Sequence, residues 1–221
     1  MTSPDELETS GHRSVESIAA FQRAAAVVLS PLALAFRLEA LGGENVPPKG
    51  AVLAANHFSH VDPWALVYPL RRGRRFRAMG KVELFGPVLG PVLRTAGAFP
   101  VRRGEGDHEA IDAAVDVVRA GDVLLIFPEG TRRRKGFRKK HQPRPHTGAA
   151  RIALAANAPL VTAAIAGTDH LLRLERWRVA YGEPVPLDDL RALDDSREAA
   201  QRATQRLWAE ISRLEESLRR R

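Results

Sequence analysis

Short apolar runs alternate with amphipathic segments along most of the chain. Runs rich in branched residues and bounded by Gly, Pro or charged positions predict strands. We expect strands at 36–41, 51–55, 75–79, 98–101, 122–127, 160–165 and 177–181. Helical spacing predicts helices at 63–71, 107–119, 147–157 and 196–220, with helical turns over 81–95. This alternation predicts an α/β fold, a single domain with a mostly parallel, mixed sheet flanked by helices.

The N-terminal part of the chain has a different pattern. Residues 1–12 are polar and are expected to form a disordered tail. Residues 13–36 predict an amphipathic, partly hydrophobic helical segment. Its uncharged run between Arg23 and Arg37 is too short for a membrane span of about 20 residues. We interpret the segment as a membrane-interfacial helix, and the alternative is a helix packed on the protein's own core. Residues 37–221 then form the folded domain.

Composition and charge narrow the possible functions. The 221 residues include no cysteine, which excludes disulfides, thiol catalysis and cysteine-bound metals. The seven histidines are scattered, so we expect no metal site. The net charge of +8 is concentrated in two basic clusters, Arg71–Arg77 and Arg132–Lys140. Such clusters suit an anionic membrane surface, an acidic carrier protein or nucleic acid.

His57 and Asp62 are a candidate base and its carboxylate partner. A histidine can accept a proton near neutral pH, and a carboxylate on its other nitrogen fixes the tautomer. Their five-residue spacing is too long for one face of a straight helix and fits a strand end that turns into a helix. We expect Asp62 to be the N-cap before Pro63, and a cap with no other role is the alternative. His60 has no such carboxylate and is expected to be a bystander.

Two loops carry arginines that could hold a phosphate. The predicted strand at 122–127 ends at a loop containing Glu129-Gly130-Thr131-Arg132. Ligands of α/β proteins lie outside such strand ends, and a guanidinium matches phosphate oxygens. Arg102 and Arg103 follow a second short apolar run. Taken alone, each loop is equally typical of a polar turn with solvated arginines.

Three motifs in order resemble the lysophosphatidic acid acyltransferase family of glycerolipid acyltransferases. They are Asn56-His57-Phe58-Ser59-His60-Val61-Asp62, Gly97-Ala98-Phe99-Pro100-Val101-Arg102-Arg103 and Phe127-Pro128-Glu129-Gly130-Thr131-Arg132. The resemblance implies that His57 and Asp62 are catalytic. It implies an acceptor phosphate site at Arg103, with Arg102 in reserve, and at Glu129, Gly130, Thr131 and Arg132. Asn56 and Gly97 would support these residues.

One motif departs from the family pattern. The family often has an apolar strand with two prolines three residues apart, whereas this chain has Pro159 and then Thr162. The departure leaves the proton chemistry intact and weakens any expectation about the acyl chain.

The resemblance also implies a reaction and partners. An O-acyltransferase would move a fatty acyl group from a thioester to the free hydroxyl of 1-acylglycerol 3-phosphate, giving phosphatidic acid. The thioester would be acyl-CoA or acyl-ACP, so acyl carrier protein is a possible partner. No bound cofactor is expected, and the enzyme would be peripheral on the cytoplasmic face of an anionic membrane. One alternative is another acceptor, such as glycerol 3-phosphate or a different lysolipid. Another is a non-catalytic basic protein, but the basic clusters hold only Phe76 and Phe137 as aromatic residues, which disfavours nucleic acid.

Overall fold

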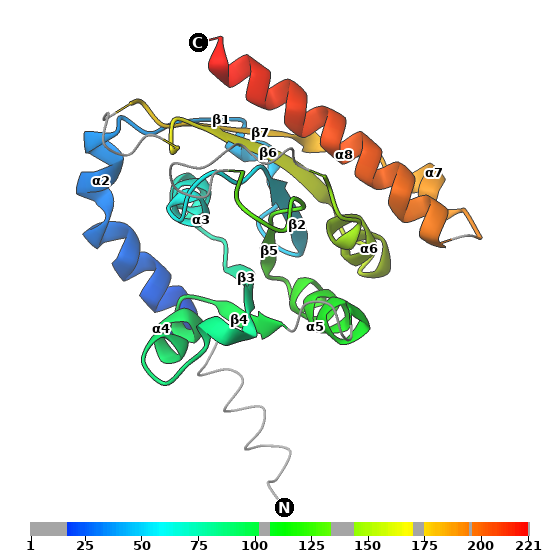
Figure 1. Ribbon diagram of the computed structural model, residues 1–221, viewed down its shortest axis with the longest axis horizontal. Coiled ribbons are helices and arrows are strands. Elements are labelled where there is room, and N and C mark those ends of the chain that lie inside the picture. The colour runs from blue at the N-terminus through cyan, green and yellow to red at the C-terminus, as the bar shows by residue number, and fades with distance from the viewer. Residues whose placement is uncertain (1–16, 102–106, 134–143, 170–174, 195, 221) are drawn as a thin grey trace, which may run out of the picture.

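The computed structural model describes residues 17–101, 107–133, 144–169, 175–194 and 196–220 (Figure 1). The predicted tail, Arg102, Arg103 and most of the second basic cluster lie outside these ranges. In the described part of the chain, one sheet of seven strands has the order β1-β7-β6-β2-β5-β3-β4. The strands are β1 (Glu39–Leu41), β2 (Ala51–Ala55), β3 (Phe76–Lys81), β4 (Ala98–Val101), β5 (Val123–Ile126), β6 (Leu160–Ala166) and β7 (Arg178–Pro184).

The sheet is mostly parallel. Among the described strands, β6 and β7 pair antiparallel and the other neighbours pair parallel. All five residues of β2, at the centre of the sheet, are buried. This burial explains why its sequence is continuously apolar, because both faces of a central parallel strand are covered. The predicted α/β class with a mixed, mostly parallel sheet is confirmed.

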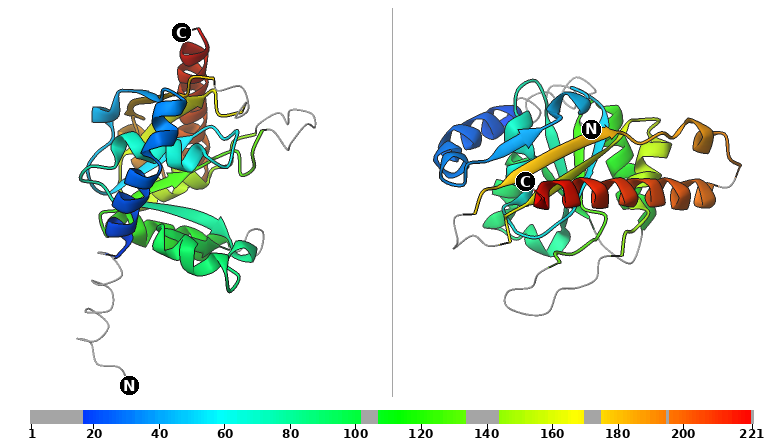
Figure 2. Two further views of the ribbon diagram at one scale, coloured as in Figure 1. Left: turned by 90° about the vertical axis from the view of Figure 1, so that its left-hand side faces the viewer. Right: turned by 90° about the horizontal axis from the view of Figure 1, so that it is seen from above.

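Helices cover both faces of the sheet (Figures 1 and 2). The helices α5 (Asp107–Arg119), α6 (Gly148–Ala155) and α8 (Ser196–Arg219) pack with the side chains of Val52 and Leu124. The helix α3 (Asp62–Val67) packs on the opposite face with Leu53 and Leu125. Alternating residues of β2 and β5 thus enter different cores. The short helices α4 (Leu89–Thr95) and α7 (Asp188–Arg191) lie at the periphery.

Some predicted boundaries were wrong for identifiable reasons. The predicted helix at 63–71 is α3 followed by a 3-10 turn, η2 (Tyr68–Leu70), because Pro69 has no N–H to continue an α-helix. The predicted strand at 36–41 shortens to β1, since Phe36 caps the preceding helix and Arg37 has φ 46°. The turns at 81–95 consist of η3 (Val82–Leu84) and α4.

The N-terminal segment is helical over residues 17–28 and in α2 (Ser30–Ala35). One side packs on the domain through buried Ile18, Ala26 and Ala33, and Gln22 Nε2 donates to the carbonyls of Phe76 and Ala96. The other side exposes apolar side chains, Val27, Val28 and Leu34, at 73%, 75% and 78%. The segment therefore combines core packing with an exposed apolar face.

Candidate active site

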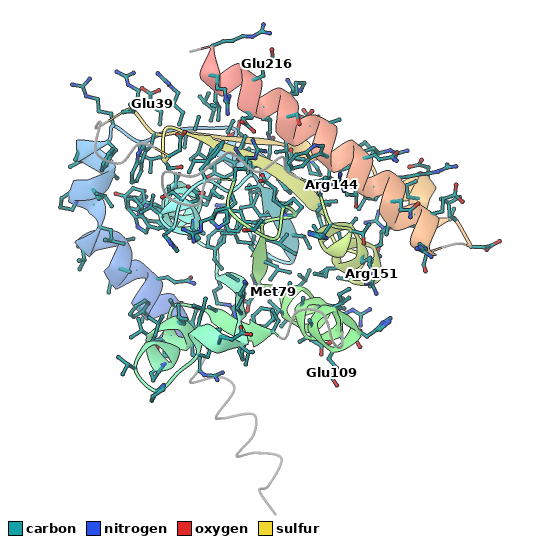
Figure 3. The ribbon with its side chains drawn as sticks, viewed as in Figure 1. Glu39, Met79, Glu109, Arg144, Arg151 and Glu216 are labelled. Atoms are coloured by element: carbon teal, nitrogen blue, oxygen red, sulfur yellow. The ribbon has the colours of Figure 1, made fainter. Side chains whose placement is uncertain are left out.

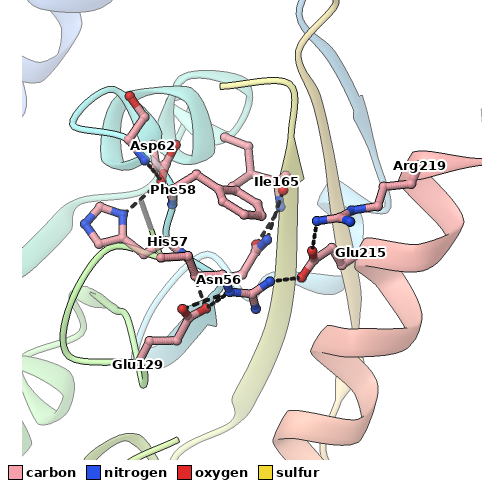
Figure 4. Close-up of polar contacts among 10 residues, drawn as sticks. Asn56, His57, Phe58, Asp62, Glu129, Ile165, Glu215 and Arg219 are labelled. Carbon is pink, nitrogen blue, oxygen red and sulfur yellow. Dashed lines mark hydrogen bonds and ion pairs between the residues drawn. The ribbon is translucent and has the colours of Figure 1, made fainter. Parts of the chain in front are cut away.

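Asn56 places the end of β2 against β6. Its amide is buried, with Nδ2 donating to the carbonyl of Ile165 at 3.0 Å and Oδ1 accepting from the Ile165 N–H at 2.8 Å (Figure 4). This pair of bonds fixes the peptide immediately before His57. Asn56, which the sequence predicts to support the neighbouring site residues, thus makes its contacts with β6.

The ring of His57 faces the carboxylate of Asp62. His57 Nδ1 lies 2.9 Å from Asp62 Oδ2, and the Asp62 side chain is completely buried (Figure 4). A carboxylate at this distance accepts the Nδ1 proton, which leaves Nε2 as the nitrogen that can take a proton. The ring of Phe127 stacks on that of His57 at 4.0 Å between centroids.

The prediction that Asp62 caps α3 was wrong. Asp62 is the first residue of α3, and its Oδ2 accepts from the N–H groups of Phe58 at 2.6 Å and Ser59 at 2.7 Å. Its Oδ1 accepts from Thr168 Oγ1 at 2.6 Å. The carboxylate points back at the loop because the chain between His57 and Asp62 folds around it. With His57 Nδ1, four donors therefore surround the negative charge of Asp62.

Thr168 was missed in the sequence. It follows β6, the neighbour of β2 in the sheet, and it is completely buried. The rule that sites lie outside the carboxyl ends of central strands could have suggested it once the strand order was known.

Glu129 lies inside the protein at the end of β5. It is 5% exposed, and its Oε1 accepts from the His57 N–H at 3.3 Å. Both of its oxygens accept from Arg133 Nε at 2.9 Å. Burial raises the pKa of the Glu129 carboxyl, and the hydrogen bond and charge of Arg133 oppose that rise. Its carboxylate thus faces Arg133 and the peptide N–H of His57.

Gly130, Thr131 and Arg132 continue the same loop. Gly130 has φ +65°, and a Cβ there would lie 3.1 Å from the His146 ring, so glycine meets both a backbone and a space requirement. Thr131 is half-buried. Arg132 NH1 contacts His60 Nε2, and burial, followed by the charge of Arg132, lowers the pKa of His60. His60, for which the sequence predicts no catalytic role, thus contacts Arg132.

Gly97 lies far from this loop in the sheet, beside β3. Its φ is +96°, and a Cβ would lie 2.4 Å from the carbonyl oxygen of Phe76. The glycine is thus required by the close approach of two backbone segments. Arg103, six residues further on, is outside the described residues.

A cavity of about 490 Å³ opens beside Phe58, in the loop that follows His57. Phe58 lines it together with Gly167, Arg178 and Arg219. Residues of the loop after His57, of the carboxyl end of β6 and of α8 contribute to its wall. Among the described residues, His, Asp and Glu side chains form no group of three or more that could hold a metal ion.

Known proteins are similar to this chain in sequence. The family model described as Acyltransferase matches residues 37–166. A 1-acyl-sn-glycerol-3-phosphate acyltransferase of Bacillus subtilis is 31% identical over 183 residues, 79% of this chain and 86% of the relative. A protein of the same name from Streptococcus pneumoniae is 28% identical over 170 residues, which are 75% of this chain and 60% of the relative.

A solved structure has a similar fold. The crystal structure of the 1-acyl-sn-glycerophosphate (LPA) acyltransferase PlsC from Thermotoga maritima aligns with a TM-score of 0.59 and 20% identity, covering 90% of this chain and 79% of that chain. At this identity the likeness concerns the fold alone. The family model spans more than half of the chain, and the Bacillus relative exceeds 30% identity over most of it. The chain belongs to the Acyltransferase family.

Proposed function

We propose that the protein transfers a fatty acyl group from a thioester to the free hydroxyl of 1-acylglycerol 3-phosphate, giving phosphatidic acid for phospholipid synthesis. The observation that carries this proposal is the contact of His57 with the buried carboxylate of Asp62, 2.9 Å away, at the carboxyl end of a central strand. The names of the Bacillus and Streptococcus relatives support the acceptor.

The proposed chemistry uses His57 as a general base. Nε2 takes the proton of the acceptor hydroxyl while its oxygen attacks the thioester carbonyl, and Asp62 stabilises the imidazolium. The tetrahedral intermediate collapses with formation of the ester and cleavage of the C–S bond. The proton on Nε2 then passes to the departing thiolate. The chain has no cysteine, and direct attack requires no acyl-enzyme.

The acceptor phosphate is proposed to lie at the loop after β5. Arg132 and the backbone of Gly130 and Thr131 would face it. Arg103 is a further candidate ligand because of its spacing from Gly97. Glu129 would contribute indirectly, because a carboxylate that already accepts from Arg133 and the His57 N–H repels rather than binds a phosphate. Its role is to hold the loop and the base in one geometry.

The donor is proposed to be acyl-CoA or acyl-ACP. Either carries the thioester on a phosphopantetheine arm, and Phe58, the residue after the base, lines the cavity that could receive it. No bound cofactor takes part in this scheme.

A peripheral position on the cytoplasmic face of an anionic membrane completes the proposal. Each described helix is too short or too polar to cross a bilayer. Most of the exposed large apolar side chains lie on residues 17–35, on η3, on α4 and on Val88, which precedes α4 and is 85% exposed, and Gln22 joins the two parts at Ala96. These elements lie on one side of the sheet, at the left of Figure 1. An apolar surface of this kind suits shallow insertion among lipid headgroups.

The first basic cluster contributes less to membrane attraction than its sequence indicates. Arg74 donates to the carbonyls of Val46 and Gly43, and Arg75 pairs with Asp122 at 2.5 Å. These cations are engaged by the protein, so the apolar side chains support the membrane proposal more strongly than this cluster does.

A thiol-release assay tests the proposal. Both donors are crossed with 1-acylglycerol 3-phosphate, glycerol 3-phosphate and neutral lysolipids. His57→Ala should lower turnover by about two to four orders of magnitude, and His108→Ala, an exposed histidine on α5, should leave turnover unchanged. Acyl transfer to another acceptor alone would reassign the substrate. Full activity of folded His57→Ala would refute the mechanism.

A further inference from the structure

The peptide of the base is held from both sides by the loop after β5. Glu129 Oε1 accepts from the His57 N–H at 3.3 Å, and the N–H of Arg133 donates to the His57 carbonyl at 2.9 Å. Both contacts come from residues four positions apart in one loop. The position of that loop therefore sets the position of the base.

The same loop is tied to the C-terminal helix by the side chain of Arg133. Its Nε donates to both oxygens of Glu129 at 2.9 Å, and its NH1 donates to Glu215 Oε2 on α8 at 2.6 Å (Figure 4). Glu129 and Glu215 are buried at 5% and 7% exposure. One guanidinium thus joins two buried carboxylates, one beside the base and one on α8.

Charges and rings complete the connection. Arg219 donates to the other oxygen of Glu215 at 2.6 Å, so two cations balance two carboxylates. The Arg133 guanidinium also lies over the rings of Phe58, at 5.1 Å, and Trp208, at 5.5 Å. Phe58 follows His57 directly, and Trp208 lies on α8. The two cation–π contacts of Arg133 therefore also link the loop after His57 to α8.

We propose that Arg133 and Glu215 are positioning residues for the catalytic base, which they fix by clamping the His57 peptide and the loop after β5 to α8. The role given to His57 rests on the proposed function. A phosphate-binding role for Arg133 fits the geometry less well, because its donors Nε and NH1 already serve two carboxylates. A purely stabilising ion pair would resemble the exposed pair of Glu216 and Arg220, which has no contact with the site.

The closing experiment compares Arg133→Gln, Glu215→Gln and the double variant with Glu216→Gln. Glu216 is the matched control, since it projects from the outer side of the same helix, 66% exposed, and its partner is also an arginine (Figure 3). Both substrates' KM values and kcat are measured by thiol release. Hydrogen exchange is followed in peptides that contain residues 56–62, and chemical denaturation checks folding.

We expect kcat to fall by about 100-fold in Arg133→Gln, as for a base displaced by about 1 Å, and by about tenfold in Glu215→Gln. Neither KM should change much. The double variant should lose no more than Arg133→Gln, because both substitutions break one connection. Exchange at residues 56–62 should accelerate in both single variants and stay unchanged in Glu216→Gln. Arg133→Lys should restore part of kcat, since a lysine can reach one carboxylate.

The pH profile gives a readout that a stabilising role would leave unchanged. Burial raises the pKa of the Glu129 carboxyl, as does the charge of Glu215, while Arg133 lowers it. Arg133→Gln removes the lowering influence, so the pKa of Glu129 should rise further. If ionised Glu129 holds the His57 N–H, activity is lost as pH falls through that pKa. The acid limb of kcat should then move to higher pH in Arg133→Gln.

Three results would overturn the inference. A raised acceptor KM with normal kcat would make Arg133 a phosphate ligand. Additive losses in the double variant would separate Arg133 from Glu215. Unchanged exchange at 56–62 in folded Glu215→Gln would show that α8 does not hold the base. The exchange measurement needs no turnover, so it decides the positioning even if the wild type transfers no acyl group to any acceptor, a result that would refute only the proposed function.

Discussion

Asp62→Asn tests whether the negative charge of Asp62 stabilises a positive charge on His57. The substitution keeps the shape of the side chain and removes one buried negative charge. In the wild type, the Asp62 carboxylate accepts hydrogen bonds from His57 Nδ1 at 2.9 Å, from two backbone N–H groups at 2.6 and 2.7 Å, and from Thr168 at 2.6 Å. An asparagine can accept some of these bonds, but it cannot neutralise an imidazolium.

The expected loss in kcat follows from the burial of Asp62 beside His57. Leaving one member of a buried ion pair without its partner costs about 3–5 kcal/mol. During turnover the imidazolium of His57 would form without Asp62, so this cost adds to the barrier. At about 1.36 kcal/mol for each factor of ten, kcat should fall by about two to four orders of magnitude. Stability should fall by up to about 4 kcal/mol, since each of the four charge-assisted bonds that becomes neutral loses about 1 kcal/mol.

Thiol release at saturating donor and acceptor measures kcat, and urea denaturation measures stability. Asp116→Asn, an exposed carboxylate on α5, is the matched control and should behave as the wild type. If a folded Asp62→Asn variant keeps kcat within about fivefold of the wild type, Asp62 does not stabilise charge on His57. The contact between His57 and Asp62 would then be structural.

Three further outcomes are expected. Gly182→Ala would place a methyl group 2.3 Å from Thr162 Oγ1, so overpacking should lower the free energy of unfolding by about 1–3 kcal/mol in urea, and unchanged stability would contradict the tight contact. Tyr181→Phe removes the hydroxyl that donates to the Leu66 carbonyl at 2.6 Å and should cost about 1–3 kcal/mol by the same measurement, with a neutral result counting against this bond. Arg103→Ala should raise the acceptor KM far more than the donor KM, and equal effects would remove Arg103 from the acceptor site.

The sheet was predictable because its central strands are apolar on both faces. A run such as Ala51–Ala55 is buried over its whole length, so its sequence alone indicates a strand. Boundaries were less predictable where backbone geometry decides them. Arg37 takes φ 46° and delays β1, and the proline of η2 ends α3 earlier than its apolar pattern indicates. Neither effect changes hydrophobic periodicity.

The site was predictable only where its partners are close in sequence. His57 and Asp62 are five residues apart, and their contact follows from one short loop. Thr168 is 106 residues from Asp62, and Glu215 is 82 residues from Arg133. Arg133 stands in a run of basic residues, where sequence favours a solvated side chain. Its burial depends on α8 crossing the sheet beside it, which no local pattern encodes.

Asn56 explains how the chain can leave the sheet so close to the base. β2 pairs with β6 up to Ala55, whereas β6 continues to Ala166. The buried N–H and C=O of Ile165 would lose their partners where β2 ends, at a cost comparable to two hydrogen bonds. The amide of Asn56 replaces a peptide group and satisfies both. The backbone of His57 is thereby released from the sheet and can bond to Glu129 and Arg133 instead, so His57 is supported by the loop after β5 and not by its own strand.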